Sequence, residues 1–305
     1  MKRKWVILLT AAAMAAGMVG CGGSEGSAAG QEAENQGESA AADGADDQEA
    51  DNGTGETEES ETAEESQDLY VFIAASLANA MEEIKEDYEA LHPEIHIIYN
   101  ADSSGTLQTQ IQEGAQCDIF FSAAEKQMNE LAEEGYIVEG TVKNLLENKV
   151  VLIKPAGGET SVTGFENITD AANLALAGED VPVGQYAREI FQNLGIYDQV
   201  MAMEINEGAN VTAVLAAVSE AANEVGVVYA TDAQSVADSV EIIAEPPEGS
   251  LDTPVLYPVG QVEDCQGDEA ETAAAAEFLE YLSSDQAAST FSSWGFSPTD
   301  QPSAK

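Results

Sequence analysis

Two stretches of the chain follow one local pattern, in which an apolar strand runs into a small-residue turn that carries serine, and a helical pattern follows. The first begins at residue 69 and has Ser76 in its turn, and the second begins at residue 95 and has Ser103 and Ser104 there. The first backbone N–H groups of a helix have no partner within the helix, and the helix dipole adds positive potential at that end. Two such helix starts aimed at one point, with serine hydroxyls, make an anion site without lysine or arginine. The pattern therefore predicts a binding site for a small oxyanion.

From Asp68 onward, short apolar runs alternate with helical patterns, which favours an α/β fold with largely parallel strands. The expected strands cover residues 70–74, 95–99, 119–122, 150–154, 181–184, 226–230, 240–243 and 255–262. The expected helices cover residues 79–92, 106–113, 125–134, 186–194, 210–222 and 268–282.

The part of the chain from residue 68 onward is long for one simple core, so we expect two lobes. The runs at 150–155 and 255–262 have the pattern of segments that cross between lobes. In this view residues 68–148 and 258–305 form lobe one, and residues 149–257 form lobe two. A ligand is expected in the cleft between the lobes, where strand ends and helix starts face each other.

The N-terminus has the features of an export signal. A basic start, an apolar run and small residues ending at Cys21 make residues 1–21 a predicted signal peptide, because the apolar run is too short to span a bilayer. The small-residue run resembles a bacterial lipobox, which would make Cys21 the lipidated first residue; an ordinary secretion signal with an incidental cysteine is the alternative. Residues 22–67 are polar and acidic and are expected to be a disordered tether.

The formal net charge of −47 argues against nucleic acid as a partner, because nucleic-acid binding needs a cationic surface. It does not exclude an anion pocket, since salt screens surface charge beyond about 8–10 Å. Cys117 and Cys265 could form a disulfide only if the fold brings them together. His92 and His96 flank Pro93, so one helical face cannot present both to a metal ion.

Four motifs, in the same order, resemble those of the molybdate-binding proteins of ABC importers. They are AASLANAM at 74–81, ADSSGTL at 101–107, CDIFFSA at 117–123 and GVVYATDA at 226–233, and the resemblance covers residues 68–299. The resemblance implies a two-lobed type II periplasmic-binding-protein fold whose lobes close over a tetrahedral oxyanion. It also implies a monomeric extracytoplasmic receptor, held at the membrane by its lipid anchor alone, which delivers molybdate or tungstate to an ABC transporter permease and uses no cofactor.

The resemblance also places the family's ligand positions on this chain. Serine hydroxyls are implied at Ser76 and Ser104, backbone N–H donors at Val183 and Val211, and a phenol at Tyr229. These groups would hold the oxygens of the oxyanion, with no direct ligand to the metal atom. The turn before Val183 is shorter than the family pattern.

Each of these residues also has a simpler interpretation. A serine after a strand is often only a helix N-cap, and a tyrosine in an apolar strand is often core. Arg188, one turn into an expected helix, is interpreted as a surface ion pair rather than an anion clamp.

Other functions stay open at this point. Sulfate has the charge and acceptor count of molybdate, and a protonated phosphate could use Asp102 as an acceptor. An enzyme is not expected, because the chain has only 2 histidines and neither lies near a plausible nucleophile. A structural or adhesive surface lipoprotein is a third class.

Overall fold

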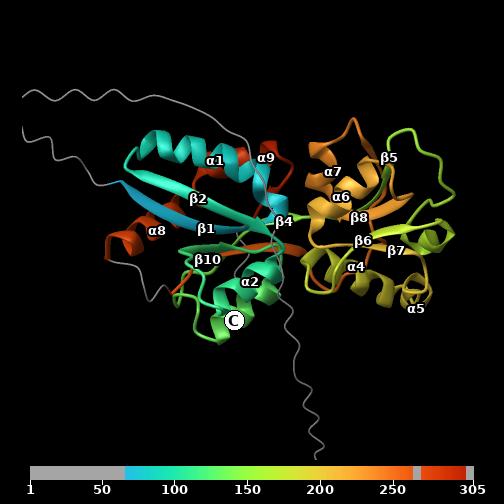
Figure 1. Ribbon diagram of the computed structural model, residues 1–305, viewed down its shortest axis with the longest axis horizontal. Helices are drawn as coiled ribbons and strands as arrows, with labels where there is room; N and C mark the ends of the chain where they lie inside the picture. The colour runs from blue at the N-terminus through green and yellow to red at the C-terminus, as the bar shows by residue number, and fades with distance from the viewer. Residues whose placement is uncertain (1–65, 264–268, 300–305) are drawn as a thin grey trace, which may run out of the picture. The chain divides into compact units, whose positions relative to one another are not determined.

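The computed structural model describes residues 66–263 and 269–299 (Figure 1). The predicted signal peptide at 1–21, including Cys21, lies outside the described residues, as does the predicted tether up to residue 65. Cys265 lies outside them too, so the question of a disulfide to Cys117 stays as the sequence leaves it. Within the described ranges, no helix has the length and apolarity needed to cross a membrane.

The first sheet has six strands in the order β11-β4-β10-β3-β1-β2. These strands are β1 (Gln67–Ala74), β2 (Ile95–Asp102), β3 (Ile119–Phe121), β4 (Lys143–Asn148), β10 (Val255–Gln261) and β11 (Ser297–Pro298). β1 pairs in parallel with β2 and β3, whereas β10 pairs antiparallel with β3 and β4, and β11 antiparallel with β4. The expectation of largely parallel strands is therefore correct for β1, β2 and β3, which make up half of this sheet. The other pairs are antiparallel, because β10 runs in the opposite direction when the chain returns from the second sheet, and so does β11.

The second sheet has five strands in the order β7-β6-β8-β5-β9. They are β5 (Val150–Pro155), β6 (Leu174–Ala177), β7 (Ile205–Gly208), β8 (Val225–Tyr229) and β9 (Val240–Ala244). β6 pairs in parallel with β7 and β8, and β5 pairs antiparallel with β8 and β9. Both sheets thus combine a parallel part, where strand ends meet helix starts, with antiparallel strands that carry the chain between the sheets.

Helices cover both faces of each sheet (Figure 1). Around the first sheet are α1 (Ala78–Leu91), α2 (Ser104–Gln112), α3 (Glu125–Glu133), α8 (Glu269–Leu282) and α9 (Asp285–Ser293), with the 3₁₀ helix η1 (Ala75–Leu77) before α1. Around the second are α4 (Pro182–Asn193), α5 (Tyr197–Val200), α6 (Val211–Ser219), α7 (Ala230–Ser235) and the 3₁₀ helix η2 (Phe165–Asp170).

The core of the first sheet follows from the alternation of side chains along a strand. Val71 and Ile73 of β1 belong to the cluster that includes α1 and α8, whereas Phe72 points to the other face and packs with Leu107 of α2 and Met128 of α3. Strands buried on both faces become near-continuous apolar runs, which is why the sequence of β1 shows no polar side.

The expected strand at 181–184 is wrong. Val181 is instead the N-cap residue of α4, and Pro182 occupies the first helical position, where its fixed φ and missing N–H are tolerated. The strand of this segment is β6, whose leucines and alanines are good helix formers by propensity. Burial between β7 and β8 decides the outcome in favour of a strand.

The chain passes from one sheet to the other at two places. Lys149 separates β4 of the first sheet from β5 of the second, and the return is made before β10. Because β10 begins at Val255, the expected start of the C-terminal part of lobe one at residue 258 falls within this strand.

Candidate oxyanion site

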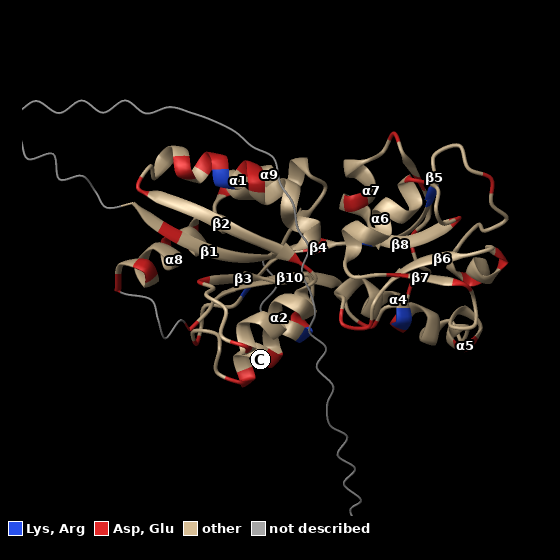
Figure 2. Ribbon diagram, in the orientation of Figure 1, with Lys and Arg blue, Asp and Glu red and all other residues tan. Residues whose placement is uncertain are grey.

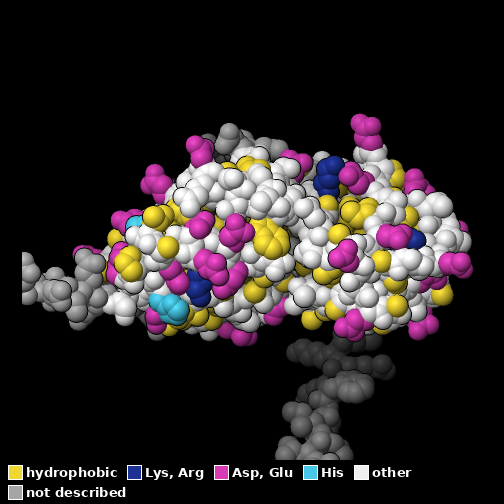
Figure 3. Space-filling model, turned by 90° about the horizontal axis from the view of Figure 1, so that it is seen from above, with side chains coloured by type: hydrophobic (Ala, Val, Ile, Leu, Met, Phe, Trp, Pro, Cys, Tyr) yellow, Lys and Arg dark blue, Asp and Glu magenta, His cyan; other side chains and the backbone are white. Residues whose placement is uncertain are grey.

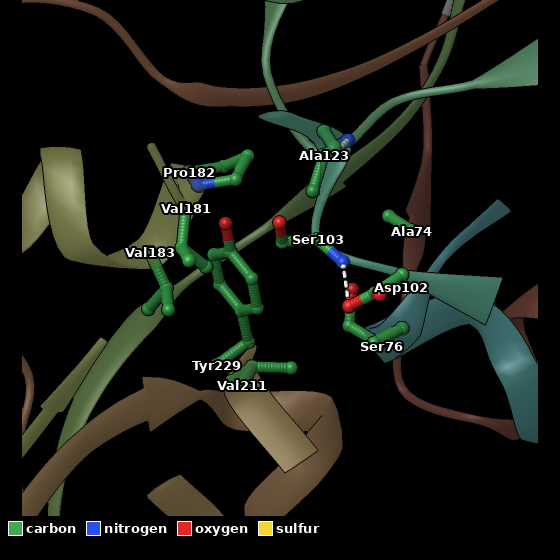
Figure 4. Close-up of a pocket in the computed structure, with 12 residues that line it drawn as sticks. Ala74, Ser76, Asp102, Ser103, Ala123, Val181, Pro182, Val183, Val211 and Tyr229 are labelled. Atoms are coloured by element: carbon green, nitrogen blue, oxygen red, sulfur yellow. Dashed lines mark hydrogen bonds between the residues drawn. The ribbon is translucent and has the colours of Figure 1, made fainter. Parts of the chain in front are cut away.

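A pocket lies where elements of the two sheets meet, with an empty volume of about 200 Å³ (Figure 4). Five elements supply most of the wall: the ends of β1 and β2, and the starts of α2, α4 and α6. Its lining residues are Ala74, Ala75, Ser76, Asp102, Ser103, Ser104, Ala123, Val181, Pro182, Val183, Val211 and Tyr229. The structure therefore brings all five residues named from the sequence resemblance to one place.

Ser76 follows β1 and enters the pocket from η1. Its hydroxyl oxygen lies 2.9 Å from the phenol oxygen of Tyr257 in β10. The side-chain amide of Asn148 donates to that same phenol oxygen at 3.1 Å. Burial raises the pKa of Tyr257 well above its ordinary value, so its phenol proton stays in place at neutral pH. Either hydroxyl can be the donor in this bond; when Tyr257 donates, Ser76 keeps its own proton for a ligand.

Ser104 is the first residue of α2 and is fully buried. It does not cap the helix, because Ser103 does so by accepting a hydrogen bond from the backbone N–H of Thr106 at 3.1 Å. Ser104 instead accepts from the backbone N–H of Ala123, just after β3, at 3.0 Å. The interpretation of Ser104 as a simple N-cap is therefore wrong, and its hydroxyl proton has no competing use among these bonds.

Val183 and Val211 lie at the starts of two helices of the second sheet. Val183 is the second residue of α4, after Pro182, and no described side chain caps this helix. Val211 is the first residue of α6, and its N-cap residue Asn210 accepts from the N–H of Ala213 at 3.0 Å. The N–H groups of Val183 and Val211 belong to the first turn, where the helix itself offers no acceptor.

Tyr229 ends β8, and its ring is almost completely buried. Its hydroxyl points into the space between Pro182 and Ser103 (Figure 4) and has no hydrogen-bond partner among the described residues. Burial, followed by the neighbouring Tyr257, raises its pKa well above the ordinary value, so the phenol remains a donor. A buried hydroxyl without a partner is costly, and an oxyanion in the pocket would supply the missing acceptor.

The pocket differs in charge from the molecular surface. Asp and Glu are spread over the elements of both sheets (Figure 2) and over the face in Figure 3 without gathering in one patch. The pocket lining has no Lys, Arg or His, and Asp102 is its one charged residue. The lining therefore offers neutral donors and helix starts, and the oxyanion site stays a prediction.

Arg188 is not on the surface, which corrects the sequence interpretation. It is 8% exposed, and its guanidinium donates to the carbonyls of Ala177 at 2.7 Å and Gly184 at 2.9 Å. The carboxylates of Glu207 and Glu179 lie 3.6 Å and 3.8 Å away. Arg188 thus ties the end of β6 to the first turn of α4, behind the N–H of Val183, and it does not line the pocket.

A larger cavity, of about 680 Å³ empty volume, shares Ala75 and Ser76 with the pocket and extends toward α7 and Trp294. Asp232 lines it and is 8% exposed. Burial raises the pKa of Asp232 to about 7, against the opposing effect of the Tyr229 N–H that its carboxylate accepts at 3.2 Å. Within the described residues, no three His, Cys, Asp or Glu side chains gather to hold a metal ion.

Three features of the site were not found from the sequence. Ser103 and Ala123 line the pocket although the motifs pointed only to Ser104. Asp102 is joined to Asn210 of the second sheet by a hydrogen bond of 3.1 Å. Asp102 and Asn210 are far apart in the sequence. Their contact is seen only in the structure, where the end of β2 and the start of α6 lie close together.

The fold and the pocket define a class of protein: a two-sheet α/β protein with a small pocket between its sheets, lined by serine and tyrosine side chains and by helix starts. The chain belongs to the family of bacterial extracellular solute-binding proteins, whose model matches residues 69–297. This is a family of binding proteins, which confirms the prediction that the chain is not an enzyme.

Individual relatives agree with this assignment. The chain is 38% identical to a putative ABC transporter substrate-binding lipoprotein of Bacillus subtilis, over 80% of this chain and 92% of that protein. It is 36% identical to the molybdate-binding protein ModA of Haemophilus influenzae, over 74% of this chain and 89% of that protein. The fold matches the periplasmic molybdate-binding protein of Azotobacter vinelandii with a TM-score of 0.64 at 21% identity, covering 75% of this chain and 98% of that one. The predicted periplasmic-binding-protein fold is thereby confirmed.

Proposed function

We propose that the protein is an extracytoplasmic receptor that binds molybdate or tungstate and delivers it to the permease of an ABC transporter. The observation that carries the proposal is the convergence of Ser76, Ser104, Val183, Val211 and Tyr229 on one pocket. The names of relatives such as the Haemophilus influenzae protein support molybdate as the ligand. The membership of the solute-binding family supports the role in import.

The chemistry of the ligand fits the donors. Molybdate and tungstate are fully deprotonated dianions at neutral pH, so their oxygens only accept hydrogen bonds. A hydrogen bond to a charged partner contributes about 1.5–3 kcal/mol, and six or so would supply roughly 9–18 kcal/mol before the cost of association. Affinity in the micromolar to nanomolar range is therefore reachable without a cationic side chain.

The pocket also bears on the competing oxyanions. Sulfate offers the same charge and number of acceptors and differs in size, so the fit of the closed pocket decides between them. A hydrogen phosphate needs an acceptor for its proton, and Asp102 is the one carboxylate in the lining. The oxygen Oδ1 of Asp102 already accepts two hydrogen bonds, so a phosphate proton would have to use the other oxygen, Oδ2. Because the five residues on which the proposal depends all offer donors, the fully deprotonated ions are favoured.

Titration calorimetry of the purified protein with molybdate, tungstate, sulfate and phosphate tests the proposal. We expect tight 1:1 binding of molybdate or tungstate that a tenfold excess of sulfate barely weakens. Equal affinity for sulfate would overturn the choice of ligand and leave an oxyanion receptor. An absence of binding by all four ions would overturn the oxyanion site itself.

The proposal includes an anchor and an assembly state. We propose that a lipid on Cys21 and the acidic segment 22–67 hold a monomeric receptor at the outer face of the membrane. The similarity to the Bacillus subtilis lipoprotein supports the anchor. Two or more acyl chains are needed for stable anchoring, which a bacterial lipoprotein has.

A further inference from the structure

Asp102 joins the N-cap residues of two helices. Its carboxylate oxygen Oδ1 accepts a hydrogen bond from the backbone N–H of Ser103 at 2.7 Å and from the side-chain amide of Asn210 at 3.1 Å. Ser103 caps α2 and Asn210 caps α6. The residue after each cap, Ser104 in α2 and Val211 in α6, lines the pocket. One carboxylate oxygen therefore connects two helix starts that face the same pocket.

The two helix starts belong to different sheets. Asp102 is the last residue of β2 in the first sheet, whereas Asn210 follows β7 in the second. The backbones also approach closely nearby, since a Cβ added to Gly105 would collide with the carbonyl oxygen of Asp180. The bond between Asp102 and Asn210 can therefore form only when the two sheets come together at this edge.

The side chain of Asn210 makes two hydrogen bonds, one within its own helix and one to the other sheet. Its side-chain oxygen accepts from the N–H of Ala213 at 3.0 Å, while its side-chain nitrogen donates to Asp102. The amide thus fixes the start of α6 and ties it to β2 with the same group. Serine and aspartate would cap the helix about as well as asparagine, but neither can donate an amide N–H to a carboxylate.

We propose that Asp102 and Asn210 form a latch that holds the receptor closed and slows release of the bound oxyanion, an inference that rests on the function proposed above. Both are positioning residues: they set Ser104 and Val211 against one ligand and leave the ligand bonds to others. The latch acts on the closed state, so its effect falls on the dissociation rate more than on the association rate. Both residues are partly exposed, which limits the strength of the bond.

Three variants distinguish the effect of the Asp102–Asn210 hydrogen bond from the effects of helix capping and of net charge. Asn210→Ser keeps the cap and replaces the amide that donates to Asp102 with a shorter hydroxyl. Asn210→Asp keeps the cap and sets two carboxylates against each other. The exchange Asp102→Asn with Asn210→Asp restores a donor and an acceptor in reversed order and keeps the total charge of the pair. In the exchanged pair the new amide oxygen can still accept from Ser103, and the new carboxylate can still accept from Ala213.

Stopped-flow measurement of molybdate release is the first readout. We expect Asn210→Ser to speed release about three- to tenfold and Asn210→Asp to speed it further. The exchanged pair should return to within about threefold of the wild type, which a merely structural effect of either substitution would not produce. Unchanged release in Asn210→Ser, or an exchanged pair as fast as Asn210→Asp, would overturn the latch.

The second readout needs no ligand. Fluorophores carried by non-canonical amino acids at two exposed positions report how far apart the sheets are: Leu91 in α1, beside the first sheet, and Ile242 in β9 of the second sheet. We expect ligand-free Asn210→Ser and Asn210→Asp to shift toward larger separations, and the exchanged pair to return to the wild-type distribution. Identical distributions in all proteins would overturn the latch. If the wild type bound no oxyanion, the proposed function would fail while this measurement still judged the latch.

Discussion

The hydroxyl oxygen of Ser104 accepts a hydrogen bond from the backbone N–H of Ala123 over 3.0 Å. This bond links the start of α2 to the end of β3, and it fixes the direction of the remaining hydroxyl proton. Ser76 is held in a comparable way by Tyr257 at 2.9 Å. In Ser104 a neighbouring donor occupies the oxygen, so the proton is left to serve an acceptor that the protein itself does not provide. Ser76 is in the same position when Tyr257 is the donor of their bond.

Ser76→Ala and Ser104→Ala should each weaken molybdate binding about ten- to hundredfold, because each removes one hydrogen bond to a charged ligand. Titration calorimetry measures the change. Ser292→Ala, which changes a serine exposed on α9, is the control and should leave the affinity unaltered. Wild-type affinity in both pocket variants would show that the serine hydroxyls do not touch the ligand.

Tyr229→Phe should lower affinity by a similar factor and leave the stability of the ligand-free protein unchanged or slightly higher. The reason is that the hydroxyl lost has no partner among the described residues. Tyr257→Phe is the matched comparison, since it removes a hydroxyl bonded to Ser76 and Asn148 and should cost about 1–3 kcal/mol of stability. Thermal melts and calorimetry on both variants test the contrast, which a comparable loss of stability in both would refute.

Arg188→Ala should destabilise the protein by about 2–3 kcal/mol and weaken ligand binding, because it removes the guanidinium that donates to the buried carbonyls of Ala177 and Gly184. Arg188→Lys should retain part of both properties, since an ammonium can reach one carbonyl but lacks the fork of the guanidinium. Denaturant unfolding and calorimetry give the two values. An Arg188→Ala protein as stable as the wild type would contradict the role in holding α4.

Asp232 should make the protein more stable as the pH falls from 7 toward 5. Burial raises the pKa of this carboxyl from 3.8 to about 7, so in this window the folded state binds a proton that the unfolded state does not. Above pH 7 the folded protein bears the full cost of the buried charge, on the order of 4 kcal/mol. Melting temperatures of wild type and Asp232→Asn across this range isolate the effect, and parallel profiles would contradict it.

Cys21→Ala should release the receptor from the membrane fraction without changing its affinity for molybdate. Lipidation at this cysteine would hold the protein only through its acyl chains, and the pocket lies in the folded part beyond residue 66. Cell fractionation followed by calorimetry of the released protein checks both statements. A variant that stays in the membrane fraction would remove the basis for a lipid anchor.

Sequence patterns predicted most of the parallel strands, and the family resemblance named five of the residues that line the pocket. Ser76 and Ser104 could be identified from the sequence because the strand–turn–helix pattern lies within a short stretch of the chain. The expected strand at 181–184 failed because the leucines and alanines of β6 favour a helix by propensity, and only burial between neighbouring strands overrides that preference.

Contacts between segments far apart in the chain could not be predicted in the same way. Arg188 has the pattern of a surface residue on α4, and its burial depends on the turn after β6 folding back over it. The bond from Asp102 to Asn210 depends on how the two sheets meet, which no local pattern encodes. Long-range geometry, rather than residue type, decides both.

In the proposed site, Val183 and Val211 offer the ligand their main-chain N–H groups, which affects how such receptors can diverge in evolution. A mutation can replace either side chain without deleting the donor, since every residue except proline carries the same N–H. Drift at these two positions can therefore reshape the wall of the pocket, and with it the preferred ion radius, while the number of hydrogen bonds stays constant. The preference for one ion over another can therefore evolve at these two positions through changes in side-chain volume alone.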